Sequence, residues 1–170
     1  MKNFFAVLIC VAGAVLLAGC GQQAGNDGAK QATPAPAAAA ALVVPPANDE
    51  RAWKLYLSSV VKQHMEGIRS SPYMYYLPAE GSDEFQEQFD RQRDNVAGAV
   101  FRGVLPGNML AFGSPSSDRM ADLIVEAFEG VSAGSMKGVR VLFIGSQGDL
   151  ERVKEAIEPT GASVVFHEIK

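Results

Sequence analysis

Two short loops combine glycine, serine and acidic residues in a pattern that could bind an anion. Residues 113–119 and 145–149 each follow an apolar run and precede a helical pattern. The first N–H groups of a helix have no partner within the helix, so such a loop could hold a phosphate or a carboxylate. The candidate ligand-binding residues are Ser114, Ser116, Ser117, Ser146, Gln147 and Asp149. The same residue types cap ordinary helices, and the absence of a lysine-bearing phosphate loop favours capping alone.

Ser114 and Ser146 are also the candidate nucleophiles of a hydrolase. A serine nucleophile needs a neighbouring base, and the chain has two histidines, His64 and His167. Either histidine could meet one of these serines, but no G-x-S-x-G segment is present. Each histidine is therefore expected to be a packed or surface residue, and no catalytic residue is assigned.

No segment has the spacing of a known metal or cofactor site. The chain contains no cysteine cluster, no H-E-x-x-H and no calcium-loop pattern. Neither serine loop matches G-x-G-x-x-G. We expect no metal and no cofactor.

Two further clusters are candidates for a binding surface. One is an aromatic run around Met74, formed by Tyr73, Tyr75 and Tyr76. If this run forms an edge strand, the cluster could bind a partner, although one of its faces is expected to pack in the core. The other cluster consists of Asp83, Glu84, Glu87 and Asp90. These acids alternate with glutamine and arginine, which is typical of a solvated helix face with ion pairs.

Cys20 is the candidate for covalent modification. It follows a basic start, Met1-Lys2-Asn3, and an uncharged run from Phe4 to Ala18. These are the features of a secretory signal, and the run is shorter than the roughly 20 apolar residues of a transmembrane helix. The other cysteine, Cys10, lies inside this run. The mature chain would therefore have no disulfide partner for the Cys20 thiol.

The segment Leu17-Ala18-Gly19-Cys20 resembles the lipobox of bacterial lipoproteins. The resemblance implies that diacylglycerol is attached to the Cys20 sulfur, that the chain is cleaved before Cys20, and usually that the new amino terminus is acylated. Residues 1–19 would then be a signal peptide, and several acyl chains would anchor the protein stably. Gly21 follows the cysteine, where an aspartate would favour retention in the inner membrane, so we expect the outer membrane. An ordinary secretory signal with an incidental cysteine, or a signal anchor, is the alternative.

Residues 20–48 have the composition of a disordered tether after the lipidated cysteine. Glycine, glutamine, alanine and proline dominate them, with too few bulky apolar side chains to bury a core. Prolines on both sides of the alanine run, from Pro34 to Pro46, would stop a helix from propagating. As a flexible coil the tether would span about 30 Å, which places the domain away from the bilayer.

Residues 49–170 alternate between helical and strand periodicity and have the length of one domain. Helices are expected over residues 49–68, 82–101 and 150–158, and a further helix follows the turn at residues 113–118, with its apolar face from Met120 to Phe128. Strands are expected over residues 73–77, 108–112, 139–144 and 163–169. Strands separated by helical connections pair in parallel through right-handed crossovers. We therefore expect an α/β domain with a small, open, mostly parallel four-stranded sheet flanked by helices. A flavodoxin-like or truncated Rossmann-like strand order is the default expectation, with ligands at the carboxyl ends of the strands.

The charge and the anchor together limit the functional classes. Removing the signal also removes Lys2, which changes the net charge from −4 to −5, so nucleic acid is not an expected partner. We expect a membrane-anchored cell-envelope lipoprotein whose domain faces the periplasm or the cell surface and binds a protein partner or a cell-wall component. A tethered envelope hydrolase that uses Ser114 and Ser146 is the alternative. A small-ligand binding protein is a third hypothesis, against which the single-domain size counts.

Overall fold

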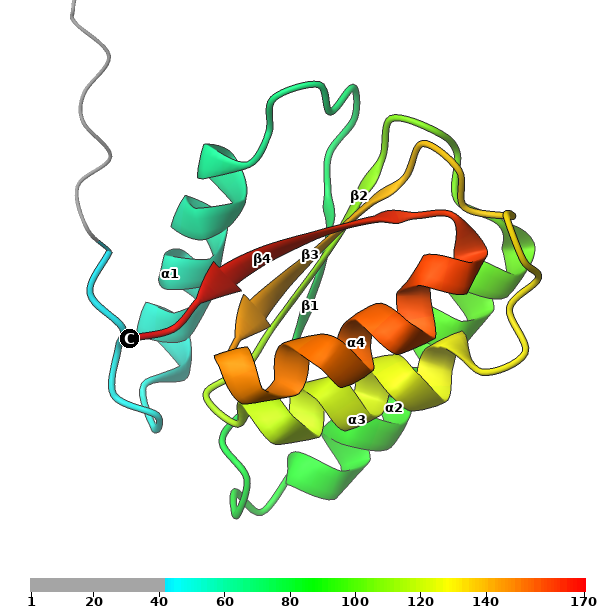
Figure 1. Ribbon diagram of the computed structural model, residues 1–170. Coiled ribbons are helices and arrows are strands. Elements are labelled where there is room, and N and C mark those ends of the chain that lie inside the picture. The colour runs from blue at the N-terminus through cyan, green and yellow to red at the C-terminus, as the bar shows by residue number, and fades with distance from the viewer. Residues whose placement is uncertain (1–41) are drawn as a thin grey trace, which may run out of the picture. The chain divides into compact units, whose positions relative to one another are not determined.

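The computed structural model describes residues 42–170, which Figure 1 shows as a twisted sheet with helices on both faces. The predicted signal peptide (1–19), the lipidation site Cys20 and most of the predicted tether lie outside the described residues. Within residues 42–170, no helix combines the length and the apolar composition needed to cross a membrane.

The elements alternate along the chain as the periodicity predicts. The helices are α1 (Glu50–Gln63), α2 (Phe85–Arg102), α3 (Ser117–Phe128) and α4 (Leu150–Ile157). The strands are β1 (Tyr73–Tyr76), β2 (Met109–Gly113), β3 (Arg140–Gly145) and β4 (Ser163–Glu168). Short 3₁₀ turns, η1 (Gln147–Asp149) and η2 (Glu158–Thr160), flank α4. The predicted α/β class with a small, open, parallel sheet is confirmed.

The strands lie in the sheet in the same order as in the chain, β1-β2-β3-β4, and every neighbouring pair is parallel. The default expectation of a flavodoxin-like or truncated Rossmann-like order was wrong where it implied a switch point, because the strand order of this sheet never reverses. Successive right-handed crossovers in one direction put all their helices on the same face. Accordingly, α2, α3 and α4 cover one face of the sheet, and α1 covers the other (Figure 1).

The core has two layers, one on each face of the sheet. Alternate residues of the central strands point into one layer or the other. Leu110 and Phe112 of β2 pack on the side of α2, α3 and α4. Met109 and Ala111, which point the other way, pack against α1 together with Trp53. Strands buried on both faces give continuous apolar runs, which is why β2 and β3 are conspicuous in the sequence.

Two helix predictions differ from the structure. Helix α1 ends at Gln63, not at Ile68, and the chain then turns, with Gly67 at a positive φ of 78°. The Arg140 guanidinium donates hydrogen bonds to the carbonyl oxygens of His64, the C-cap residue, at 2.6 Å and of Glu66, in the turn that follows, at 2.9 Å. Phe101, which was assigned to the apolar face of α2, is 84% exposed.

The chain contacts the α1 side of the core before the predicted domain start at Asp49. Leu42 and Val44 pack against this layer. The Trp53 Nε1 atom donates a hydrogen bond to the Pro46 carbonyl oxygen at 3.1 Å. The side chain of Asp49 accepts from the N–H of Ala52 at 2.9 Å and caps α1. The last residues of the predicted tether therefore lie against the domain.

Candidate functional site

A groove of about 710 Å³ lies beside the edge strand β1. Helices α1 and α2 cover opposite faces of the sheet, and both supply side chains to this groove. Its lining comes from α1, β1, the loop that follows β1, and α2, and consists of Glu50, Lys54, Leu57, Ser58, Met74, Tyr76, Pro78, Ser82, Asp83, Glu84, Gln88 and Gln92. The groove therefore follows the side of β1 that has no neighbouring strand within residues 42–170.

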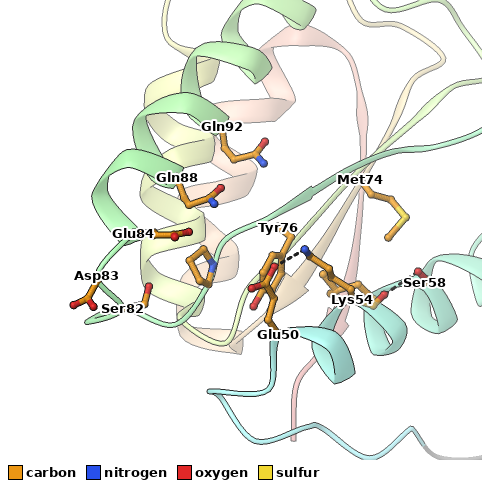
Figure 2. A pocket seen from close by; sticks show the side chains of 12 residues that line it. Glu50, Lys54, Ser58, Met74, Tyr76, Ser82, Asp83, Glu84, Gln88 and Gln92 are labelled. Atoms are coloured by element: carbon orange, nitrogen blue, oxygen red, sulfur yellow. Dashed lines mark hydrogen bonds and ion pairs between the residues drawn. The ribbon is translucent and has the colours of Figure 1, made fainter.

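The two walls of the groove present polar side chains. Figure 2 shows Gln88 and Gln92 projecting from α2, opposite Lys54 on α1. Lys54 forms an ion pair with Glu50, one helical turn earlier, and both side chains are exposed. Exposed i, i+4 pairs contribute roughly 0.3–0.5 kcal/mol. A ligand could therefore displace the Lys54 side chain at little cost.

Tyr76 lies beneath this ion pair. The Lys54 Nζ atom is 5.6 Å from the centre of the Tyr76 ring (Figure 2). Within the described residues the Tyr76 hydroxyl is buried without a hydrogen-bond partner. Burial raises the pKa of Tyr76 to about 12, and the nearby carboxylates of Glu50 and Asp49 add to the rise. The phenol is thus protonated at neutral pH and is available as a hydrogen-bond donor.

The first serine loop is closed by its own hydrogen bonds. Ser114 is fully buried, and its hydroxyl accepts from the N–H of Ser116 at 2.9 Å. The Ser114 hydroxyl also donates to the carbonyl oxygen of Pro78 at 3.5 Å, and the Ser116 hydroxyl accepts from the N–H of Glu80 at 2.8 Å. These bonds connect the loops that follow β1 and β2.

Ser117 and Asp149 join the loop after β2 to the loop after β3. The Ser117 hydroxyl donates to the Asp149 carboxylate at 2.7 Å and accepts from the N–H of Ser146 at 2.7 Å. The Arg152 guanidinium donates to the same carboxylate at 2.8 Å. Asp149 stands at the N-cap position of α4 as expected, but its side chain makes no capping hydrogen bond. The expectation that Ser117 caps α3 was wrong, because Ser116 stands at the N-cap position and the Ser117 hydroxyl bonds to the loop after β3.

None of the six predicted ligand-binding residues lines the groove. Four of them, Ser114, Ser116, Ser117 and Asp149, have side chains engaged in bonds between loops. Ser146 contributes its backbone N–H to the Ser117 hydroxyl, and Gln147 is exposed at the start of η1. The structure thus places the predicted residues together at the carboxyl ends of β2 and β3, where they hold the loops.

The two histidines contact each other and not the serines. The ring centres of His64 and His167 are 5.8 Å apart, where the end of α1 meets β4. The Nε2 atom of His167 is 3.3 Å from the Tyr56 hydroxyl oxygen. Within residues 42–170, no hydrogen bond joins either histidine to a serine, and the Nε2 atom of His64 is buried without a partner. The hydrolase hypothesis therefore gains no base from this arrangement.

Acidification is expected to weaken the contact between α1 and β4. Burial lowers the pKa of His64 and of His167 below 6.5, with a further lowering of His64 by Arg140 and of His167 by His64. A lowered pKa in the folded state means that folding favours the neutral rings. The contribution of the two neutral rings to the free energy of unfolding is therefore complete above about pH 6.5 and is lost as the pH falls below that value. Urea unfolding of the full chain, repeated between about pH 7.5 and pH 5, should show this loss, and His167→Gln should reduce it. If the free energy of unfolding fell equally steeply with pH in the variant, His167 would not be responsible for the loss.

The tyrosine and carboxylate clusters divide between the core and the groove. Strand β1 is an edge strand, the condition under which the tyrosine cluster was expected to bind a partner. Tyr75 stacks on Phe112 at 5.0 Å in the core, whereas Met74 is 43% exposed in the groove lining. Glu87 pairs with Arg91 at 3.4 Å, as predicted for a solvated helix face. Asp90 of the same cluster forms an ion pair with Arg93 at 3.1 Å. The other two carboxylates, Asp83 and Glu84, line the groove.

Nothing in the sequence indicated that α1 and α2 line the same groove. Glu50, Lys54, Gln88 and Gln92 are ordinary polar positions of amphipathic helices. No group of at least three His, Cys, Asp or Glu side chains in the described part of the chain could hold a metal ion.

A scan against protein-family models and searches of curated proteins and of solved structures found no match to this chain.

Proposed function

We propose that this protein is a lipid-anchored component of the bacterial cell envelope and that its α/β domain binds a protein partner in the groove beside β1. The groove is the observation that carries the proposal: it is open, it is lined by polar and apolar side chains from four segments, and it follows a strand edge that no strand of the described residues pairs with. Free strand edges and partly exposed aromatic side chains are common in protein recognition.

The alternative of a tethered hydrolase has less support. Its two candidate serines lie in loops that their own hydrogen bonds hold together, and the histidines lie beside Tyr56. The anchor is supported by the lipobox-like segment ending at Cys20, and the outer membrane by Gly21. The tether would let the domain reach a partner away from the bilayer.

Replacing Cys20 with serine is expected to release the protein from the membrane fraction of cells. The hydroxyl of serine cannot form the thioether, and several acyl chains at about 0.8 kcal/mol per buried methylene account for the anchoring. Cys10→Ser is the matched control, because that cysteine would be removed with the signal peptide. Intact-mass analysis of the mature wild-type protein should show acyl chains on a chain that begins at Cys20. A mature protein with an unmodified thiol or another first residue would contradict the anchor.

Site-specific photocrosslinking tests the groove. A photoreactive amino acid placed at Ser58 or at Gln88, on opposite walls, is expected to give an adduct with the same protein in living cells. Glu155, which is exposed on α4, is the control position and should not give this adduct. Mass spectrometry identifies the adduct. Equal labelling from Glu155 would refute binding in the groove, and an adduct with cell-wall glycan would show that the ligand is not a protein.

A further inference from the structure

The free edge of β1 is accessible within a groove whose walls are already formed. In the described residues β1 pairs with β2 alone, so every second residue of β1 directs its backbone N–H and C=O away from the sheet. Side chains of α1 and α2 flank this edge from the two faces of the sheet. An extended chain entering the groove would meet backbone donors and acceptors along its floor and side-chain amides and hydroxyls on its walls.

The charge of the lining favours a basic occupant. The lining contains three carboxylates, those of Glu50, Asp83 and Glu84, and one cation, Lys54. Lys54 is already paired with Glu50. Asp83 and Glu84 are exposed, and no cationic side chain in the described residues forms an ion pair with either of them. A lysine or arginine in the occupant would supply the missing partner.

We propose that a basic, extended polypeptide segment of the partner adds to β1 as a fifth strand and places a lysine or arginine against Asp83 and Glu84. This inference rests on the proposed function and specifies how the partner binds. The four residues of β1 correspond to roughly 13 Å of strand, which matches a short linear segment. Main-chain hydrogen bonds would provide much of the affinity, and the walls would select the side chains.

Tyr76 adds a specific contact to this arrangement. It lines the groove beneath the Lys54 side chain, and within residues 42–170 its hydroxyl has no partner. When Lys54 moves to admit the added strand, this hydroxyl could donate to one of the strand's carbonyl oxygens. Tyr76→Phe removes a buried hydroxyl that has no partner in the unbound protein, so the free energy of unfolding should be unchanged or higher. Peptide binding by this variant should be weaker by about fivefold, the value of one modest hydrogen bond.

The experiment begins with a displayed library of random peptides, each about 12 residues long, selected on the full-length protein in detergent. The selected peptides are expected to be enriched in lysine and arginine. Each backbone N–H of the best peptide is then methylated in turn. Strand addition predicts that alternate methylations weaken binding by about tenfold or more, because alternate residues face β1. Binding through side chains alone would show no such alternation and would overturn strand addition.

Charge reversal tests the basic residue separately. Glu84→Lys is expected to weaken binding of the selected peptide by about fivefold or more, and Asp83→Lys serves as a second variant. Glu87→Lys is the control: it makes the same change three residues later, in the first turn of α2 and outside the groove lining. Equal losses in the Glu84 and Glu87 variants, or selected peptides without basic residues, would overturn the charge assignment.

The outcomes for the two proposals are distinguishable. If the library gives no binder, or if methylation shows no alternation, the added-strand model fails. Crosslinking of one protein from both Ser58 and Gln88 would still support protein binding in the groove. If that crosslinking also fails, the proposed function itself is wrong.

Discussion

Trp53→Ala is expected to lower the free energy of unfolding by about 3 to 5 kcal/mol, the range for truncating a buried tryptophan to alanine. Trp53 is 2% exposed and is the largest side chain that α1 inserts between itself and the sheet. It makes an edge contact with Tyr56, with the ring centres 5.5 Å apart. Its loss would leave a cavity and would free the Pro46 carbonyl oxygen from its indole donor. Chemical denaturation of the full chain measures the change.

The matched control for this variant is Leu55→Ala on the same helix. Leu55 is 63% exposed, so its truncation should change the stability by no more than about 0.5 kcal/mol. Because α1 forms one wall of the groove, Trp53→Ala should also weaken ligand binding there. Equal stabilities of the two variants would mean that the packing of Trp53 against the sheet does not stabilise the position of α1.

Gly145→Ala is expected to lower the free energy of unfolding by about 2 to 4 kcal/mol. A Cβ atom at Gly145 would overlap the ring of Phe143 and lie 2.6 Å from the Ser117 hydroxyl oxygen. Neither neighbour can move easily, since Phe143 is fully buried and two hydrogen bonds hold the Ser117 hydroxyl. The substitution would therefore strain the core and separate the loops that Ser117 joins.

Gly148→Ala provides the comparison for this variant. A Cβ atom at Gly148 would meet no atom within 4 Å, and its backbone does not have a positive φ. Its stability should stay within about 0.5 kcal/mol of the wild type. Thermal or urea unfolding of the two variants side by side checks the pair. A stable Gly145→Ala protein would show that the loop at the end of β3 can relax.

The sequence by itself determined the types and order of the elements and the parallel class of the sheet. Apolar runs such as that of β3 and the spacing of apolar residues in α3 are local signals, and helix-bearing connections supply the crossovers that parallel pairing of successive strands requires. The lipobox-like segment ending at Cys20 is also local, so the anchor prediction does not depend on the fold.

Only the tertiary structure decided the strand order, and with it the position of the groove. The position of β1 at the sheet edge, paired in the described part of the chain with β2 alone, depends on contacts between segments far apart in the chain, which no local periodicity encodes. For the same reason the sequence did not place Lys54 and Gln88 on one groove, and it assigned a capping role to Ser117, whose hydroxyl joins two loops. The residue type determines the chemistry of a side chain, but the packing of distant segments determines which groups that side chain contacts.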